Sequence, residues 1–270
     1  MDCEQGRGTP PIRLLTLNAH QGFAALRRRR LLSGIRDALR TSNADLVFLQ
    51  EVGGDHGEDV AQQHYEMLAD QVWPQHAYGR NVVAASGHQG NALLSKYPIV
   101  RWQNVDVSVG GVEPRGLLHC VLDVQLAGPA LHTVCVHLGL RESHRRWQVD
   151  RLLEFVADSI PHDAPLVIAG DFNDWRERAH IRMLADSTLT EVHACSSGRP
   201  ARTFPAGWPW LRLDRIYVRN LLHRPLAIPR RRWSELSDHA PLAAEVRVRE
   251  SGAVGFSRPK AQVPASGSSR

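Results

Sequence analysis

The sequence predicts an α/β fold in which mixed β-sheets pack face to face and helices cover their outer faces. Short apolar segments of strand length recur along the chain, whereas helical periodicity is clear in only two segments. No repeat and no internal linker rich in Pro, Gly or Ser divides the chain, and 270 residues suit one large domain. So many strands with so few helices between them favour antiparallel or mixed sheets.

The predicted strands are recognised by their apolar side chains. In the last of them Leu242, Ala244 and Val246 alternate with Glu245 and Arg247, the pattern of a strand with one buried face. The segments DLVFLQ and PLVIA are apolar almost throughout and predict buried strands. The strands are expected at residues 12–18, 45–50, 91–94, 116–126, 131–138, 165–169, 213–218 and 242–248.

The two predicted helices and the two chain ends complete the organisation. Apolar residues fall on one helical face over residues 26–41, and again over about 143–159. Residues 1–11 predict a disordered lead, and residues 250–270, rich in Ser, Gly and Pro, a disordered tail. The folded domain is therefore expected to span residues 12–249.

Composition limits the functional classes only loosely. The net charge is +5, but residues 251–270 contain Arg258, Lys260 and Arg270 and no acid, which leaves about +2 for the body. A weakly basic body is compatible with an anionic substrate without indicating DNA. The four cysteines form no CxxC pair, so buried free thiols are favoured over a disulfide or a zinc site. With no signal peptide and no run of roughly 18 apolar residues, a cytoplasmic monomer is expected.

Polar residues recur where the apolar strands begin or end. Strand ends are positions where loops can build a site on a rigid base. Each such residue also has an ordinary explanation on its own: an Asx turn, a capping residue, a surface carboxylate or a structural histidine. The residues concerned are Asn18, Glu51, His137, Asp171, Asn173, Asp214, Asp238 and His239.

Two of these positions suit a metal and an activated water. Glu51 follows a very apolar strand, and Mg²⁺ binds one or two carboxylates with waters and substrate phosphate. In the segment GDFND, Asp171 and Asn173 are two residues apart, so in an extended chain both point to the same side. An acid can orient or deprotonate water while an amide fixes its position.

The segments LDRIYV and SDHAPL suit an oriented imidazole. Asp238 and His239 stand at the start of a strand and can offer a carboxylate to a metal and an imidazole to a phosphate. Asp214 lies inside an apolar strand, where a carboxylate is costly to bury unless it is paired. Its natural use is to hold an imidazole cationic and in place.

In this order and spacing, the segments resemble the endonuclease/exonuclease/phosphatase superfamily, which has the DNase I-like fold. The resemblance covers about residues 12–248. It implies a four-layer sandwich, with two mixed β-sheets packed together, helices outside, and one site at the top edge. The matching segments are LLTLNAH (14–20), LQEV (49–52), GNALLSKYPI (90–99), VCVHLGL (134–140), IAGDFND (168–174), RLDRIYV (212–218) and SDHAPL (237–242).

The resemblance also implies a metal and its ligands. Glu51 is expected to be the principal Mg²⁺ ligand, with Mn²⁺ as a possible substitute. Asn18 is expected to be the amide beside that metal and the site water. Asp238 is expected to contact the metal directly or through water. Whether one metal or two operate is left open by the residues.

Catalytic roles follow from the same resemblance. Asp171 is expected to activate the attacking water and Asn173 to orient it. His239 is expected to bind the scissile phosphate, with Asp214 as its orienting carboxylate. His137 stands where the family places a phosphate-contacting His or Tyr.

Substrate identity is less constrained, because fold and core site do not select among DNA, RNA, phospholipids and smaller esters. Arg27 and Arg28, in a run of four arginines over 27–30, are candidates for binding phosphate, although a solvated helix face gives the same pattern. Trp208, in an aromatic loop, can stack a base or touch lipid. Asn91 is a further candidate for substrate binding.

A nuclease or DNA-repair-type phosphodiesterase is the favoured function. A hydrolase of phospholipids or small phosphodiesters is the main alternative, and a phosphomonoesterase is a lesser one. A catalytically silent binding module on the same fold is a hypothesis from a different class. The complete set of polar residues, from Asn18 to His239, argues against it.

Overall fold

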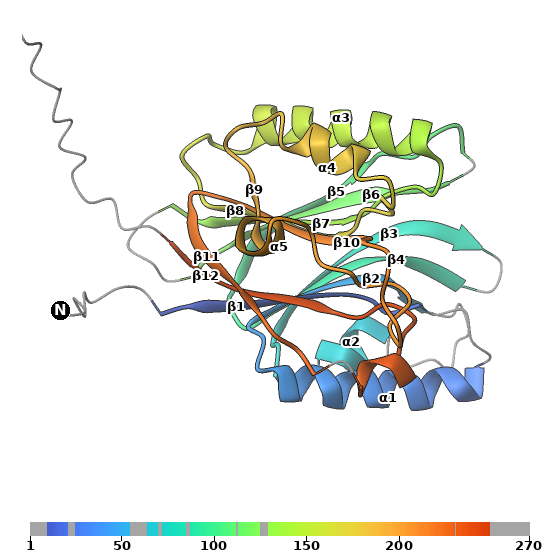
Figure 1. Cartoon of the computed structure of the whole chain (residues 1–270). Coiled ribbons are helices and arrows are strands. Elements are labelled where there is room, and N and C mark those ends of the chain that lie inside the picture. Colours follow the sequence, from blue (N-terminus) through green and yellow to red (C-terminus); the bar gives the residue numbers. More distant parts are fainter. Residues whose placement is uncertain are drawn as a thin grey trace, which may run out of the picture.

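The computed structural model describes residues 10–20, 25–54, 64–69, 72–84, 87–111, 113–124, 129–229 and 231–248. Its elements form four layers (Figure 1). Helices α1 (Ala25–Ser42) and α2 (His64–Ala69) cover the outer face of one sheet, and α3 (Glu142–Ser159) and α4 (Arg178–Met183) cover that of the other. The predicted sandwich of two packed mixed sheets is confirmed.

Within the described residues, each sheet has six strands. The first has the order β11 (Leu221–Leu226), β12 (Leu242–Val248), β1 (Ile12–Asn18), β2 (Leu46–Gly54), β4 (Gly87–Ser95) and β3 (Gln75–Ala84). The second has the order β5 (Ile99–Asp106), β6 (Gly116–Leu122), β7 (Leu131–His137), β8 (Leu166–Asp171), β10 (Asp214–Arg219) and β9 (Thr190–Glu191). The short helix α5 (Val192–Ser197) and a 3₁₀ turn (Trp233–Glu235) complete the elements.

The strand directions bring several strand ends to one edge of the sandwich. Only β1–β2 and β7–β8 are parallel among the paired strands described, and each of these two pairs ends at that edge. The registers place Asn18 beside Gln50 and His137 beside Asp171. Strand β10 runs antiparallel to β8, so its first residue, Asp214, pairs with Asp171 at the same level. The pairing of the strands therefore places residues that are far apart in the sequence close together at this edge.

Successive residues of the central strands enter different parts of the core. Leu14 on β1 packs with Phe48 in the cluster between the two sheets. Its neighbour Leu15 packs with Ile35 of α1 in the cluster beneath that helix. Each such leucine contributes roughly 1.5–3 kcal/mol by leaving water. Because both faces are covered, the central strands have apolar residues at successive positions, which made them recognisable in the sequence.

The strands that the sequence did not reveal are β3, β5, β9 and β11, which are the outer strands of the two sheets. An outer strand has one unpaired edge; β5 is largely exposed, and β11 is mostly half-buried or exposed. Their sequences, IVRWQNVD and LLHRPL, are therefore mixed in character. Pro225 also lies in β11, where the outer edge tolerates the loss of a backbone donor.

Three predicted strand ends were wrong by four residues. Strand β6 ends at Leu122 and not at residue 126, β4 begins at Gly87 and not at residue 91, and β2 ends at Gly54 and not at residue 50. Cys120, Cys135 and Cys195 are free, and the first two are buried, as expected. The predicted disordered ends, apart from residues 10 and 11, lie outside the described residues. None of the described helices has both the length and the apolar character needed to cross a bilayer.

Candidate active site

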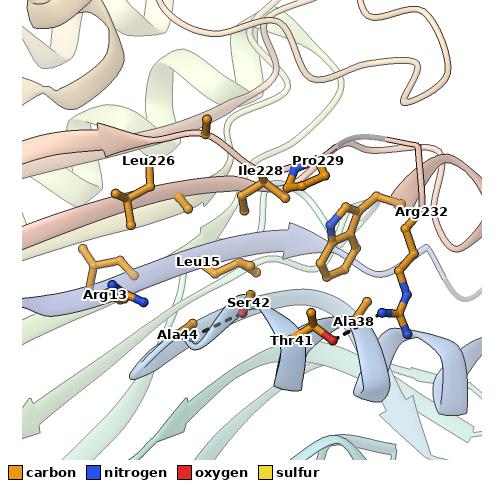
Figure 2. Close-up of a pocket in the computed structure, with 14 residues that line it drawn as sticks. Arg13, Leu15, Ala38, Thr41, Ser42, Ala44, Leu226, Ile228, Pro229 and Arg232 are labelled. Atoms are coloured by element: carbon orange, nitrogen blue, oxygen red, sulfur yellow. Dashed lines mark hydrogen bonds between the residues drawn. The ribbon is translucent and has the colours of Figure 1, made fainter.

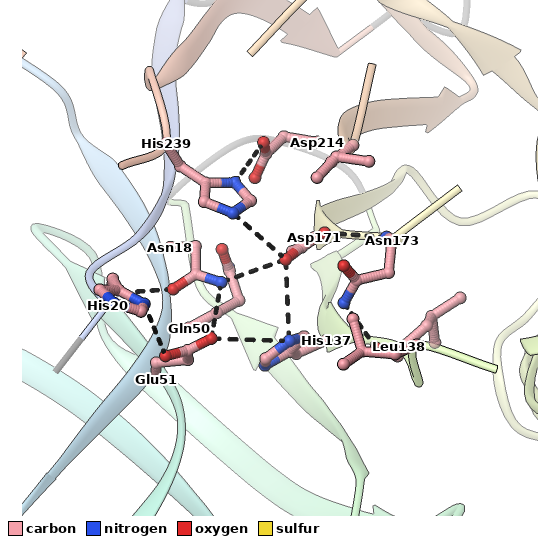
Figure 3. A network of polar contacts seen from close by, with 12 residues as sticks. Asn18, His20, Gln50, Glu51, His137, Leu138, Asp171, Asn173, Asp214 and His239 are labelled. Atoms are coloured by element: carbon pink, nitrogen blue, oxygen red, sulfur yellow. Dashed lines mark hydrogen bonds and ion pairs between the residues drawn. The ribbon is translucent and has the colours of Figure 1, made fainter. Parts of the chain in front are cut away.

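The polar residues predicted at strand ends meet in one cavity of about 310 Å³. They come from both sheets and face one another across the edge of the sandwich (Figure 3). Asp214 lies behind this group and is bonded to one of its members. The predicted residues that line the cavity are Asn18, Glu51, His137, Asp171, Asn173, Asp238 and His239.

A second cavity of about 340 Å³ lies elsewhere, between the C-terminal part of α1, strand β1 and the segment 226–233 (Figure 2). Its lining is mainly apolar, with Leu15, Ile228 and Trp233 among its residues. None of the predicted site residues whose side chains the structure describes lines it. The cavity at the strand ends is therefore the candidate active site.

A local irregularity in β2 presents Glu51 to this cavity. The pairing of β2 with β4 shifts between Leu49 and Val52, and Glu51 has a φ of 58°. Such a bulge redirects a side chain that regular pleating would place on one of the two sheet faces. A left-handed backbone is unfavourable for a glutamate, and conformations of this kind are concentrated at functional sites.

Asn18 joins the two sheets at the centre of the site. Its amide Nδ2 donates to Glu51 Oε1 at 3.0 Å and to Asp171 Oδ2 at 3.1 Å. Ser237 donates its hydroxyl to the Asn18 carbonyl at 2.7 Å and accepts the His239 N–H at 3.1 Å. The amide therefore fixes the separation of two carboxylates, and the serine anchors the segment that carries His239.

Asp171 and Asn173 form a tight turn at the end of β8. The Asn173 N–H donates to Asp171 Oδ1 at 2.8 Å, and the Asn173 side-chain amide donates to the Leu138 carbonyl at 2.9 Å. Gly170, just before them, has a φ of 149°, and a Cβ there would lie 1.9 Å from the Val136 carbonyl oxygen. Only glycine allows β7 and β8 to approach this closely, so the sequence GDFN depends on its first residue.

His239 is held by a buried carboxylate. Its Nδ1 lies 2.9 Å from Asp214 Oδ2, and its Nε2 lies 3.9 Å from Asp171 Oδ2. Burial opposes the charged imidazole, but the carboxylates of Asp214 and Asp171 outweigh burial and raise the pKa of His239 to about 10. With Nδ1 committed to Asp214, the Nε2–H of a cationic ring faces the cavity.

His137 occupies the opposite protonation state. Its Nε2 lies 3.7 Å from Asp171 Oδ2 and 3.9 Å from Glu51 Oε1. Burial dominates here and lowers the pKa of His137 to about 4, although Asp171 acts in the other direction. The ring is therefore neutral at pH 7, and its contacts with the two carboxylates are polar contacts and not ion pairs. One cavity thus holds a cationic and a neutral imidazole.

His20 and Arg115 line the cavity although they were not predicted as site residues. His20 has a φ of 38°, and its Nδ1 lies 3.6 Å from both Glu51 Oε2 and Asp238 Oδ2. It is the last residue of the segment LLTLNAH, two positions after Asn18, and that spacing was the available signal. Arg115 precedes β6 in a loop without a comparable pattern.

Other predicted residues lie outside the cavity. Asn91 is buried, and its amide donates to the carbonyls of Gly116 and Cys135, so it ties the two sheets together. Trp208 is 82% exposed and is not among the lining residues. Arg27 and Arg28 lie in α1, but their side chains are outside the described residues.

The residues present fit a hard divalent cation. Glu51 and Asp171 bring two carboxylates to one neutral amide, and a buried oxygen of Asp238 has no hydrogen-bond partner. Oxygen donors of this kind suit Mg²⁺ or Mn²⁺. Ligand atoms of Asp171, Asp214 and His239 also lie within 4.8 Å of one another. The hydrogen bond that Asp214 accepts from His239 Nδ1–H, with the raised pKa of His239, favours a charged hydrogen-bonding imidazole there over a metal ligand.

The sequence matches a family model and known proteins over most of its length. Residues 15–239 match the model of the Endonuclease/Exonuclease/phosphatase family. A protein of Escherichia coli K12, named uncharacterized protein YbhP, is 49% identical over 245 residues, which are 88% of this chain and 96% of that protein.

Solved structures share the fold at low sequence identity. The endonuclease/exonuclease/phosphatase from Bacteroides vulgatus is 17% identical with a TM-score of 0.69, covering 89% of this chain and 100% of that one. The catalytic domain of human Nocturnin with bound sulfate is 17% identical with a TM-score of 0.66, covering 87% and 94%. These likenesses concern the fold alone.

The fold is the DNase I-like sandwich, and the matching family is one of hydrolases. The chain belongs to the endonuclease/exonuclease/phosphatase family, which includes nucleases and phosphatases.

Proposed function

We propose that this chain is a Mg²⁺-dependent phosphodiester hydrolase in which water attacks phosphorus. The observation that carries the proposal is the pairing of a cationic His239 with the acceptor Asp171 across one cavity. Hydrolysis needs a positioned water, a proton acceptor for it, and positive charge near the phosphoryl oxygens. Each requirement has a group in the cavity.

Asp171 is suited to receive or orient the proton of the attacking water. Its carboxylate is held from one side by the Asn173 N–H and from the other by the Asn18 amide. The neutral His137, 3.7 Å away, can exchange a hydrogen bond with the same water or with a phosphoryl oxygen. The Nε2–H of His239 and the guanidinium of Arg115 supply positive donors for the phosphate. Buried groups fixed in this way stabilise developing charge without reorganisation.

Glu51, Asn18 and Asp238 would hold the cation, with Mn²⁺ as a possible substitute. When bound there, the metal supplies charge neutralisation and support for the leaving oxygen. Glu51 is redirected into the cavity by the β2 bulge, and His20 stands between Glu51 and Asp238. Displacing the His20 ring from this position would open both carboxylates to a cation.

The proposal is tested by turnover of bis-p-nitrophenyl phosphate. We expect hydrolysis with Mg²⁺ or Mn²⁺, loss of activity in EDTA, and a fall of at least about 10³-fold in kcat for Asp171→Asn. The exchange of Asp123→Asn is the matched control, because Asp123 is exposed and distant from the cavity lining. Absence of metal-dependent turnover from both the wild type and Asp171→Asn would favour a silent binding module, whereas equal turnover by both would overturn the role of Asp171.

Different observations support two different substrate classes. The sequence favours a nuclease or DNA-repair-type phosphodiesterase. Exposed Leu140 and Trp175 at the cavity wall favour a phospholipid. Turnover of abasic-site DNA, single-stranded DNA, RNA, phosphatidylglycerol and sphingomyelin under equal metal separates them. The nuclease hypothesis is lost if lipids are cleaved and no nucleic acid is.

A further inference from the structure

Exposed apolar side chains lie at the active-site cavity and on a loop whose two ends line it. Leu140 and Trp175 line it and are 55% and 42% exposed. Trp208 and Trp210, 82% and 58% exposed, lie on the loop 204–211, whose end residues also line the cavity. These four side chains are here called the apolar rim. Trp208 is the most exposed large hydrophobic side chain in the described part of the chain.

The loop that presents two of the tryptophans is closed by hydrogen bonds. The N–H groups of Trp210 and Leu211 both donate to the Phe204 carbonyl at 2.9 Å, and the Trp208 N–H donates to the Pro205 carbonyl at 3.2 Å. The loop is also tied to the site, because the Ala206 N–H donates to the Asp238 carbonyl at 2.6 Å. The tryptophans are thus held outward by a fixed backbone. Apolar surface maintained in this way marks an interaction surface.

Arginines accompany the rim. Arg141 and Arg176 are exposed and directly follow Leu140 and Trp175 in the chain, and Arg115 lines the cavity. Arg176 is paired with Glu142 at 3.2 Å, so Arg141 and Arg115 are the main sources of positive charge. Tryptophan is favoured at the boundary between lipid headgroups and acyl chains, since one side of the indole is apolar and its N–H is polar. Each arginine near an anionic membrane surface adds attraction. Trp, Leu and Arg at one mouth therefore fit a membrane with anionic lipids.

The same rim fits a nucleic acid less well. Leu140 has no π-face on which a base could stack. Trp175 already has the guanidinium of Arg145 at 4.3 Å from its ring centroid, so one face is covered. Trp208 stands outside the cavity that would hold the scissile phosphate.

We propose that the apolar rim docks this protein onto an anionic phospholipid membrane, which places a phosphodiester of the headgroup layer at the cavity. The cleavage of that ester rests on the proposed function, whereas docking requires no turnover. The two can therefore succeed or fail separately.

The test is co-sedimentation of the full chain, in EDTA, with vesicles of phosphatidylcholine alone or mixed with phosphatidylglycerol. We expect binding to the mixed vesicles that exceeds binding to phosphatidylcholine by about tenfold or more and weakens with salt. The double variant Trp208→Ala/Trp210→Ala should lose at least about tenfold in partitioning, because interfacial binding scales with buried apolar area.

Trp102→Ala is the matched control. Trp102 is 50% exposed and lies on β5. It pairs with Cys120 of β6, which pairs in turn with Thr133 of β7, and Thr133 is four residues before His137 at the cavity. This variant should bind vesicles like the wild type. Thermal melting of both variants checks that they are folded. Equal vesicle binding by the double variant and Trp102→Ala, or no vesicle binding by the wild type, overturns the proposal.

Two further arms separate the possible failures. Turnover of bis-p-nitrophenyl phosphate by the wild type reports on hydrolysis alone, so its absence beside normal docking would reject the proposed function and leave the rim as a membrane surface. Binding of a single-stranded oligonucleotide is measured on the same variants. If the double variant loses oligonucleotide binding while the wild type ignores vesicles, the rim is a nucleic-acid surface and the membrane proposal is wrong.

Discussion

Replacing Asp214 with Asn isolates the part of the site that keeps His239 charged. The asparagine preserves volume and can still accept from Nδ1 through its carbonyl oxygen, but it removes the buried negative charge. Burial then disfavours the imidazolium with less opposition, and the pKa of His239 should fall from about 10 toward or below its ordinary value of 6.5. At pH 8 the ring would be mainly neutral.

The size of the effect follows from that change. Raising the pKa of His239 from 6.5 to about 10 corresponds to about 4–5 kcal/mol of preference for the charged ring. Asp171 contributes part of this preference and is unchanged in the variant, so only part is lost. A loss of about 2–4 kcal/mol of transition-state stabilisation lowers kcat about 30- to 10³-fold. Removing the charge of Asp214 should also destabilise the fold. Because the pKa of His239 in the folded state is raised above 6.5, its contribution to the free energy of unfolding is complete below pH 6.5 and is lost as the pH rises through about 10.

The assay is the pH profile of kcat for bis-p-nitrophenyl phosphate, with the metal kept saturating. In the wild type the alkaline decrease should lie near pH 10, and in Asp214→Asn it should move to neutral pH or below. Part of the lost activity should then return at pH 5.5. An unchanged alkaline decrease in the variant would refute the assignment of Asp214 as the group that holds His239 cationic.

Three further predictions concern other parts of the molecule. Gly170→Ala should lower the free energy of unfolding by more than about 3 kcal/mol, because its Cβ would meet the Val136 carbonyl, whereas Gly207→Ala, in open space, should change it by less than about 1 kcal/mol in urea denaturation. Burial lowers the pKa of His119 to about 4, so the contribution of the neutral ring to protein stability is complete above pH 6.5 and is lost as the pH falls toward 4. His119→Leu should therefore reduce the loss of unfolding free energy at acid pH by about 2–3 kcal/mol. Arg115→Ala should raise KM for an anionic diester about tenfold or more with less effect on kcat, and a purely structural role would instead appear as a lower Tm.

The central strands were predictable because each is buried on both faces, and the outer strands were not. A strand such as β5 shares hydrogen bonds with a single neighbour, so water on its free side removes the apolar pattern. The site residues could be located because Asn18, His137 and Asp171 end strands whose pairing is parallel and in register. Sequence patterns convey such ends well.

Features that depend on backbone irregularities or on tertiary packing were not predictable from the sequence. Glu51 enters the cavity through a bulge, which the segment LQEV does not reveal. Arg115 reaches the site from a loop before β6 with no motif around it. Asn91 stands in a recognisable segment, but its register sends the amide to backbone carbonyls between the sheets. The sequence of the loop 204–211 does not show whether Trp208 lines the cavity or lies outside it.

Anomalous scattering from a crystal soaked with Mn²⁺ tests most directly whether these strand ends enclose a catalytic cation. We expect one strong peak in the cavity, at about 2.0–2.3 Å from a carboxylate oxygen of Glu51 and within reach of Asn18 and Asp238. A peak held by Asp171, Asp214 and His239, or none in the cavity at saturating Mn²⁺, would contradict it.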